Sequence, residues 1–134
     1  MPAEIIPPDQ LPAGITEGVN VDGVHVYRYG RAGWGLANGY AAALWATVQA
    51  ETPAQEGQPL RSGCIPAAGF SGLYTKAQAD AYLGAVARLV NAARRATAPK
   101  RAKRRADREA AAARHVETAR AMYAAHDAKH AGGL

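Results

Sequence analysis

The pattern of hydrophobic and polar positions changes several times along the chain. Residues 1–14 contain four prolines and no periodicity, which predicts an extended arm. From residue 15 to residue 29, β-branched and aromatic residues alternate on either side of Asp22-Gly23, a dipeptide that favours a tight turn between antiparallel strands. We therefore predict a β-hairpin here. Because a single hairpin is only marginally stable in water, it must pack on a helix or join another sheet.

The first helical pattern runs from about residue 36 to residue 50. Its apolar side chains recur every four positions and form one broad face, made by Leu36, Tyr40, Leu44 and Val48. The glycines of residues 30–35 predict a flexible connection before this helix. The many glycines and prolines of residues 51–72 predict a long surface loop after it.

A second helical pattern begins at Thr75. A hydroxyl followed three residues later by Gln78 is the arrangement of a capping box, and an apolar rhythm continues from there to Ala93. We expect this helix to end near Ala98, because the residue before Pro99 is disfavoured in the helical conformation. A new helix would then start at Pro99 or Lys100.

The last segment, residues 99–134, is rich in Ala, Arg and Glu and has too few large apolar side chains to form a core. It is a solvated helix, packs on the rest of the chain, or gains order from a partner. The whole pattern predicts an α+β fold that is mostly helical. It has a proline-rich arm (1–14), a small α+β body in which a hairpin packs on two helices (15–98), and a long basic C-terminal helix (99–134).

Charge is distributed unevenly along the 134 residues, whose net charge is +5. Residues 1–75 carry three basic and six acidic side chains, whereas residues 76–134 carry thirteen basic and five acidic ones. Such asymmetry favours an anionic partner, either nucleic acid or an acidic protein surface. The high Ala, Arg and Gly content is also what GC-rich coding DNA produces, so a solvated helix face is an alternative explanation for the arginines.

The densest positive charge lies around Pro99, in residues 94–108. In a helix that begins at Pro99 or Lys100, four arginines at spacings of three and four share one face, flanked by two lysines, while Ala102 and Ala106 point away. Guanidinium and ammonium groups so placed can contact several phosphates. The candidate nucleic-acid-binding residues are Arg94, Arg95, Lys100, Arg101, Lys103, Arg104, Arg105 and Arg108.

The first functional hypothesis is therefore a non-enzymatic nucleic-acid-binding accessory protein, of the kind that a phage or plasmid encodes. The second is a structural or assembly protein, such as a minor component of a phage particle, that forms an oligomer or joins a larger complex. Its anchors would be apolar side chains of the arm and the C-terminal helix, namely Ile5, Ile6, Val116, Met122 and Tyr123.

Aromatic residues of the predicted hairpin offer a further site for nucleic acid. His25, Tyr27 and Tyr29 alternate along one strand and share one face, close to Arg28 and Arg31. Such side chains can stack on bases. Packing across the hairpin is the interpretation that we favour, because aromatic residues in strands commonly serve it.

Enzyme motifs are incomplete in this sequence. Gly33–Gly39 has the wrong spacing for a dinucleotide-binding turn, and Gly69–Gly72 lacks the last glycine of a nucleophile elbow. His126 and His130 are four residues apart, but the glutamate of a metalloprotease motif is missing. We expect no catalytic residue, no metal and no cofactor.

Cysteine use and hydropathy bear on the compartment. Cys64 is the only cysteine, which indicates a reducing environment. The uncharged residues 32–50 are interrupted by glycines and polar side chains, so a buried helix explains them better than a membrane span. We expect a cytoplasmic protein that does not enter membranes.

Overall fold

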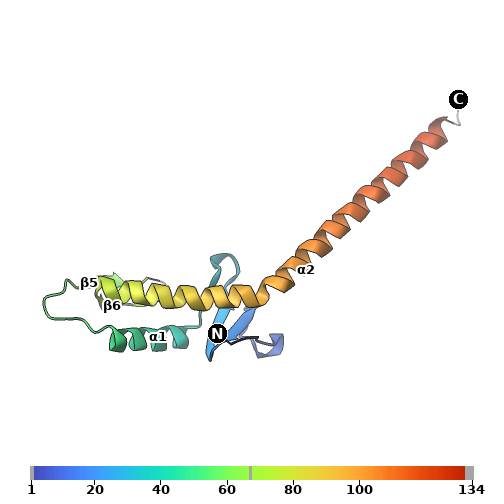
Figure 1. Cartoon of the computed structure of the whole chain (residues 1–134). Helices are drawn as coiled ribbons and strands as arrows, with labels where there is room; N and C mark the ends of the chain where they lie inside the picture. The colour runs from blue at the N-terminus through green and yellow to red at the C-terminus, as the bar shows by residue number, and fades with distance from the viewer. Residues whose placement is uncertain (1, 67, 132–134) are drawn as a thin grey trace. The chain divides into compact units, whose positions relative to one another are not determined.

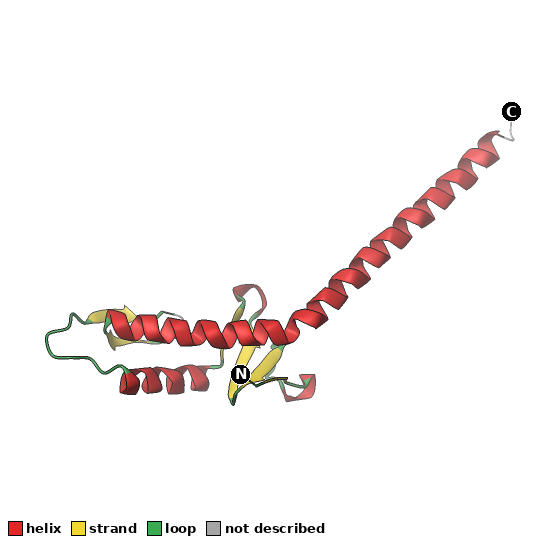
Figure 2. Cartoon of the chain, viewed as in Figure 1, coloured by secondary structure: helices red, strands yellow, loops and turns green. Residues whose placement is uncertain are grey.

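The computed structural model describes residues 2–66 and 68–131, apart from the side chains of residues 130 and 131. It is an α+β protein with a four-stranded antiparallel sheet, a small two-stranded sheet, a short helix α1 (Asn38–Glu51) and a long helix α2 (Lys76–Ala131) (Figure 1). Most of the residues are helical (Figure 2), so the predicted fold class is confirmed. The chain comprises two units, Met1–Thr97 and Ala98–Leu134.

The four-stranded sheet contains the predicted hairpin. Its strands are β1 (Ala3–Ile5), β2 (Gly18–Val21), β3 (Val24–Arg28) and β4 (Trp34–Leu36), in the order β1-β2-β3-β4. Asp22 and Gly23 join β2 to β3 with φ angles of 50° and 85°, the left-handed pair that a two-residue hairpin turn requires. The Gly23 N–H donates to Asn20 Oδ1 at 2.9 Å, which closes the turn.

Two strands of this sheet were not predicted. Within the arm, Ala3–Ile5 pairs with β2, with Ala3 opposite Val21, so this part of the arm is an edge of the sheet. Where a flexible connection was expected, β4 pairs with β3. Leu36 therefore lies opposite Val26 in the sheet and does not begin the helix, which starts two residues later.

One face of the sheet packs on α2. Val19, Val21, Val26 and Leu36 form a buried cluster with Leu89, Ala92 and Ala93 of α2 and with Ala41 of α1. The register places Val19 opposite Val26, so these apolar side chains share a face, as alternation along strands requires. Small alanines on α2 let the helix approach the valines closely.

A second buried cluster lies where α1 packs along the first part of α2 (Figure 1). The Trp45 ring meets Tyr82 and Tyr74 edge to face, with centroids 5.5 Å and 6.3 Å apart. Tyr74 belongs to the two-stranded sheet of β5 (Arg61–Cys64) and β6 (Ser71–Tyr74). The expectation of one long loop over residues 51–72 was wrong, because this hairpin lies largely within it.

Helix α2 begins with the predicted capping box and runs through Pro99. The expected end near Ala98 was wrong: Lys76–Ala131 is a single helix with Pro99 inside it. Proline costs about 3 kcal/mol in a helix interior, mainly because it removes one hydrogen bond and crowds the preceding turn. Ala, Arg and Lys on either side are strong helix formers and offset this cost. The Thr97 hydroxyl also donates to the carbonyl oxygens of Ala93 and Arg94, at 3.1 Å and 3.3 Å.

The described residues include no helix with the length and apolar character that crossing a membrane demands.

Candidate nucleic-acid interface

The net charge of the protein belongs to one of its two units. Residues 1–97 carry seven basic and seven acidic side chains, so they are formally neutral. Residues 98–134 carry nine basic and four acidic ones, which gives the whole +5. Within this second unit the excess lies in residues 100–108, the basic segment, which has six basic side chains and one carboxylate, Asp107.

The eight candidate residues all lie on α2, and they divide between the two units. Arg94 and Arg95 belong to the first unit and are exposed. The other six belong to the basic segment. Arg101 is half-buried, and the remaining five are exposed: Lys100, Lys103, Arg104, Arg105 and Arg108.

The six cations of the basic segment form what we call the cationic arc. At about 100° per residue, all of them project within about 100° of the direction of Arg104. Arg101, Arg105 and Arg108 lie to one side of Arg104, and Lys100 and Lys103 lie to the other. The carboxylate of Asp107 projects on the lysine side, about 60° from Arg104. Ala102 and Ala106 occupy the opposite side of the helix, as the sequence predicts. From Lys100 to Arg108 the arc is about 12 Å long, at 1.5 Å per residue.

The positive charge of this arc favours the approach of anions. Arginine remains protonated in proteins, and its planar guanidinium donates two parallel hydrogen bonds to a phosphate. Cations of like sign along one helix repel each other, by a few tenths of a kcal/mol for a pair four residues apart. A bound polyanion would remove this repulsion, so the arc favours a partner that carries several negative charges.

The remainder of the second unit, residues 109–131, has a different character. It carries three basic and three acidic side chains. Its large apolar side chains are exposed: Val116 by 50%, Met122 by 69% and Tyr123 by 72%. A depression of about 400 Å³ is lined by Ala119, Met122, Tyr123 and His126. This stretch, which we call the neutral segment, therefore offers an apolar surface without an excess of charge.

Of the two isoleucines proposed as anchors in the arm, the structure exposes one. Ile5 is 50% exposed in the edge strand β1, whereas Ile6 is buried. The Ile6 N–H donates to the Gly18 carbonyl oxygen at 2.9 Å, which continues the pairing beyond β1. Ile6 is therefore part of the fold and not an anchor for a partner.

The aromatic residues of the hairpin are engaged within the protein. The His25 ring stacks on Tyr40 with centroids 4.9 Å apart, and its Nδ1 lies 3.3 Å from the Tyr27 hydroxyl. Tyr27 is buried and meets Tyr29 edge to face at 6.3 Å. The Tyr29 hydroxyl donates to the Leu36 carbonyl oxygen at 3.4 Å. The packing interpretation therefore describes these rings.

Burial also affects the ionisation of this aromatic group. Desolvation is the larger cause and the electrostatic effect of the neighbouring Tyr27 is the smaller one; both raise the pKa of Tyr29 above its ordinary value. The hydroxyl of Tyr29 therefore stays protonated to a higher pH than that of an ordinary tyrosine.

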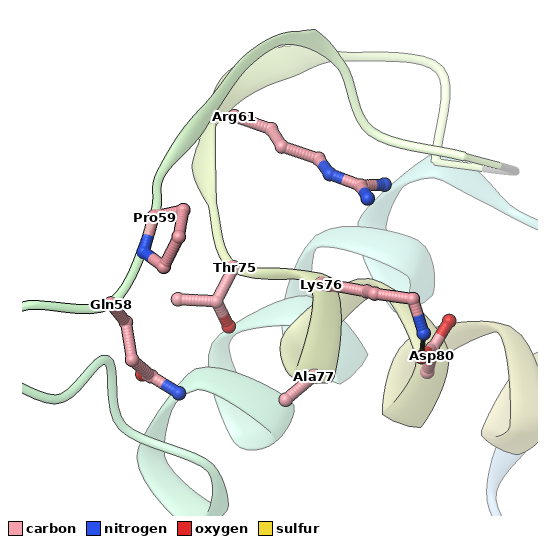
Figure 3. A pocket seen from close by; sticks show the side chains of 7 residues that line it. All are labelled: Gln58, Pro59, Arg61, Thr75, Lys76, Ala77 and Asp80. Carbon is pink, nitrogen blue, oxygen red and sulfur yellow. Dashed lines mark hydrogen bonds and ion pairs between the residues drawn. The ribbon is translucent and has the colours of Figure 1, made fainter.

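Two surface cavities of the first unit are lined by described residues. One, of about 470 Å³, lies at the start of α2 and is lined by Gln58, Pro59, Arg61, Thr75, Lys76, Ala77 and Asp80 (Figure 3). Its Lys76 ammonium pairs with Asp80 at 2.9 Å, and its Thr75 hydroxyl accepts a hydrogen bond from the Gln78 N–H. Another, of about 420 Å³, lies between α1 and α2.

Cys64, Ser71 and the two C-terminal histidines are the other side chains that could carry chemistry. Cys64 is exposed, and the Ser71 hydroxyl lies 3.7 Å from its sulfur. Ser71 lies in strand β6, not at the strand-to-helix turn that a nucleophile elbow needs. No group of three or more His, Cys, Asp or Glu side chains in the described part could hold a metal ion. The side chain of His130 lies outside the described residues, so the His126–His130 pair has no described geometry.

Comparison with known proteins finds no matching family model, no matching curated protein and no matching solved structure.

Proposed function

We propose that this protein is a non-enzymatic accessory protein that binds nucleic acid by contacting phosphates through the basic segment. The observation that carries the proposal is the placement of charge. The formal excess of +5 lies in nine consecutive residues of one helix, while the first unit is neutral. This concentration suits a polyanion with closely spaced charges better than an acidic protein surface, whose carboxylates are spread out.

Phosphate contacts of this kind depend strongly on salt and little on sequence. Each phosphate that a cation neutralises releases condensed counterions. A plot of the logarithm of the binding constant against the logarithm of the salt concentration therefore has a slope of about −0.9 per contact on duplex DNA. Four contacts would weaken binding about 150-fold between 50 and 200 mM salt. Because phosphate contacts fix position without reading bases, we expect these contacts to add similar affinity on unrelated sequences.

A fluorescence titration of labelled nucleic acid with the full-length protein tests this proposal. The informative variant is Arg105→Gln with Arg108→Gln, in the basic segment. The matched control is Arg114→Gln with Arg120→Gln, which removes the same charge from exposed positions of the neutral segment. We expect the first variant to lower the salt slope by about 1.8 and the control to leave it nearly unchanged. Equal loss in both variants, or no binding at 50 mM salt, would refute the proposal.

The neutral segment supports a second candidate function, that of an assembly protein. Exposure of Val116, Met122 and Tyr123 on a stretch without excess charge is the observation that favours it. Such a protein joins an oligomer or larger particle through apolar contacts, and Met122→Asp would prevent this while leaving nucleic-acid binding intact. Light scattering of the wild type and the variant tests it, and equal masses at the monomer value would exclude self-assembly.

The proposal also includes the compartment. A protein that binds nucleic acid and has one exposed cysteine fits the cytoplasm, where thiols remain reduced.

A further inference from the structure

We infer that the basic segment binds double-stranded DNA by lying in its major groove, with Arg104 directed toward the floor of the groove. This inference rests on the proposed function and names the form of nucleic acid that the same site takes.

The first argument concerns the width of the cationic arc. A single phosphodiester strand presents one line of charge, and a narrow stripe of cations on one side of a helix matches it. Here the cations extend about 100° to each side of Arg104, with Arg105 at one edge and Lys103 at the other. A groove has phosphates on both of its walls, so both edges of the arc would find partners there.

The second argument is dimensional. An α-helix with its side chains is about 10–12 Å in diameter, and the major groove of B-form DNA is about 12 Å wide. The basic segment is already helical, so binding does not pay for folding it. The small side chains of Ala102 and Ala106 lie on the side that would face out of the groove, and they add no bulk there.

The third argument concerns base stacking, on which proteins that bind single strands rely. The basic segment contains no aromatic residue. In the hairpin, Tyr27 is buried and His25 is stacked on Tyr40. Tyr29 is 40% exposed, but its ring meets Tyr27 edge to face and its hydroxyl donates to the Leu36 carbonyl oxygen, so all three rings are engaged within the protein. A single strand would thus gain phosphate contacts alone, and fewer counterions are released per contact from single strands than from duplexes.

A-form RNA duplexes are disfavoured by their geometry. Their major groove is deep and too narrow for side chains to read, so a helix cannot enter it. The phosphates remain accessible from outside, where one edge of the arc can reach them. We therefore expect weaker binding to double-stranded RNA than to double-stranded DNA.

The experiment compares three probes of one sequence with the full-length protein at about 150 mM salt: duplex DNA, single-stranded DNA and duplex RNA. Each has about 20 nucleotides per strand, or two helical turns of duplex. We expect duplex DNA to bind at least about tenfold more tightly than either alternative. Equal or tighter binding of the single strand or the RNA duplex would overturn the inference while leaving the proposed function intact. Absence of binding to all three when the titration is repeated at about 50 mM salt would refute the proposed function itself.

Two paired variants test the groove geometry separately. Lys100→Gln with Lys103→Gln removes one edge of the arc, and Arg105→Gln with Arg108→Gln removes cations from the other side. If both walls of a groove are contacted, each pair lowers the salt slope on duplex DNA by about 1.8. If only one of the two double variants lowers the salt slope, the contact is one-sided and the groove model is overturned. Circular dichroism of both variants verifies that the helix is retained.

Discussion

Thr75 and Gln78 cap the start of α2 for each other. The Gln78 N–H donates to Thr75 Oγ1 at 3.1 Å, and the Thr75 N–H donates to Gln78 Oε1 at 3.0 Å. Gln78 Nε2 also donates to the Thr52 carbonyl oxygen at 3.1 Å, just past the end of α1. Because both residues are buried, water cannot replace these bonds. The capping box therefore stabilises the start of α2 and also fixes it against the end of α1.

Loss of this cap should destabilise the first unit. We expect Thr75→Ala to lower the free energy of unfolding by about 1 kcal/mol, the usual cost of removing a helix cap. Gln78→Ala should cost about 1–3 kcal/mol, because it leaves the buried Thr75 N–H without its acceptor. Urea unfolding followed by tryptophan fluorescence measures both. The control is Thr118→Ala, at an exposed position of α2, which should change stability by less than about 0.5 kcal/mol.

Gly18 makes room for two side chains. A Cβ at this position would lie 2.7 Å from Leu11 Cδ2 and 2.9 Å from Tyr27 Cδ1, closer than carbon atoms can approach. We expect Gly18→Ala to destabilise the protein by about 1–3 kcal/mol through overpacking. The matched control is Gly39→Ala in α1, where a Cβ has nothing within 4 Å and where alanine favours the helix. The melting temperatures of the two variants are measured by thermal unfolding. If Gly18→Ala and Gly39→Ala lower the melting temperature equally, the prediction is contradicted.

Burial of Tyr82 should make stability fall at alkaline pH. Desolvation raises the pKa of Tyr82 above its ordinary value of 10.0. As the pH rises, Tyr82 therefore ionises in the unfolded chain at a lower pH than in the folded protein. Its contribution to the free energy of unfolding is complete below about pH 10 and is lost as the pH rises through the folded-state pKa. Tyr82→Phe should remove this part of the alkaline loss. Urea midpoints at pH 8 and pH 11 test it, with Tyr123→Phe, at a 72% exposed position, as the control that should behave like the wild type.

Pro99 should weaken α2 locally. A proline has no N–H, so the carbonyl oxygen of Arg95 receives no helical hydrogen bond from position 99. We expect Pro99→Ala to stabilise this turn by up to about 3 kcal/mol and to slow amide hydrogen exchange in residues 100–103. Exchange that is unchanged there would contradict the prediction. Pro59→Ala, in a loop, should leave exchange in α2 as it is in the wild type.

Local signals in the sequence predict the elements whose cause is local. Asp22-Gly23 specifies its turn by backbone conformation, and Thr75 with Gln78 specifies a helix start by hydrogen bonds between near neighbours. The cationic arc is predicted for the same reason, because spacing along a helix fixes which side chains share a side. These features needed no information about distant residues.

Other features depend on residues far apart in the chain. Ala3–Ile5 is a strand because β2 offers it an edge, and Arg61–Cys64 is one because Ser71–Tyr74 folds back on it. Segments of three or four residues that include Ala and Glu, or Ser and Gly, carry little strand signal of their own. Burial of Tyr27 likewise depends on the missing side chain at Gly18, which faces it across the strands. Pairing across the sheet decides such positions.

Three side chains belong to both buried clusters of the first unit. Leu44, Phe70 and Val86 are partly buried and pack against the cluster that joins the sheet to α2 and also against the group around Trp45 and Tyr82. Trp34 packs on the first cluster and Trp45 lies in the second, so each tryptophan reports on one of them. Neither cluster can come apart without exposing the side chains that they share. We therefore expect the first unit to melt as one cooperative body, with its two tryptophans losing their native fluorescence at the same temperature.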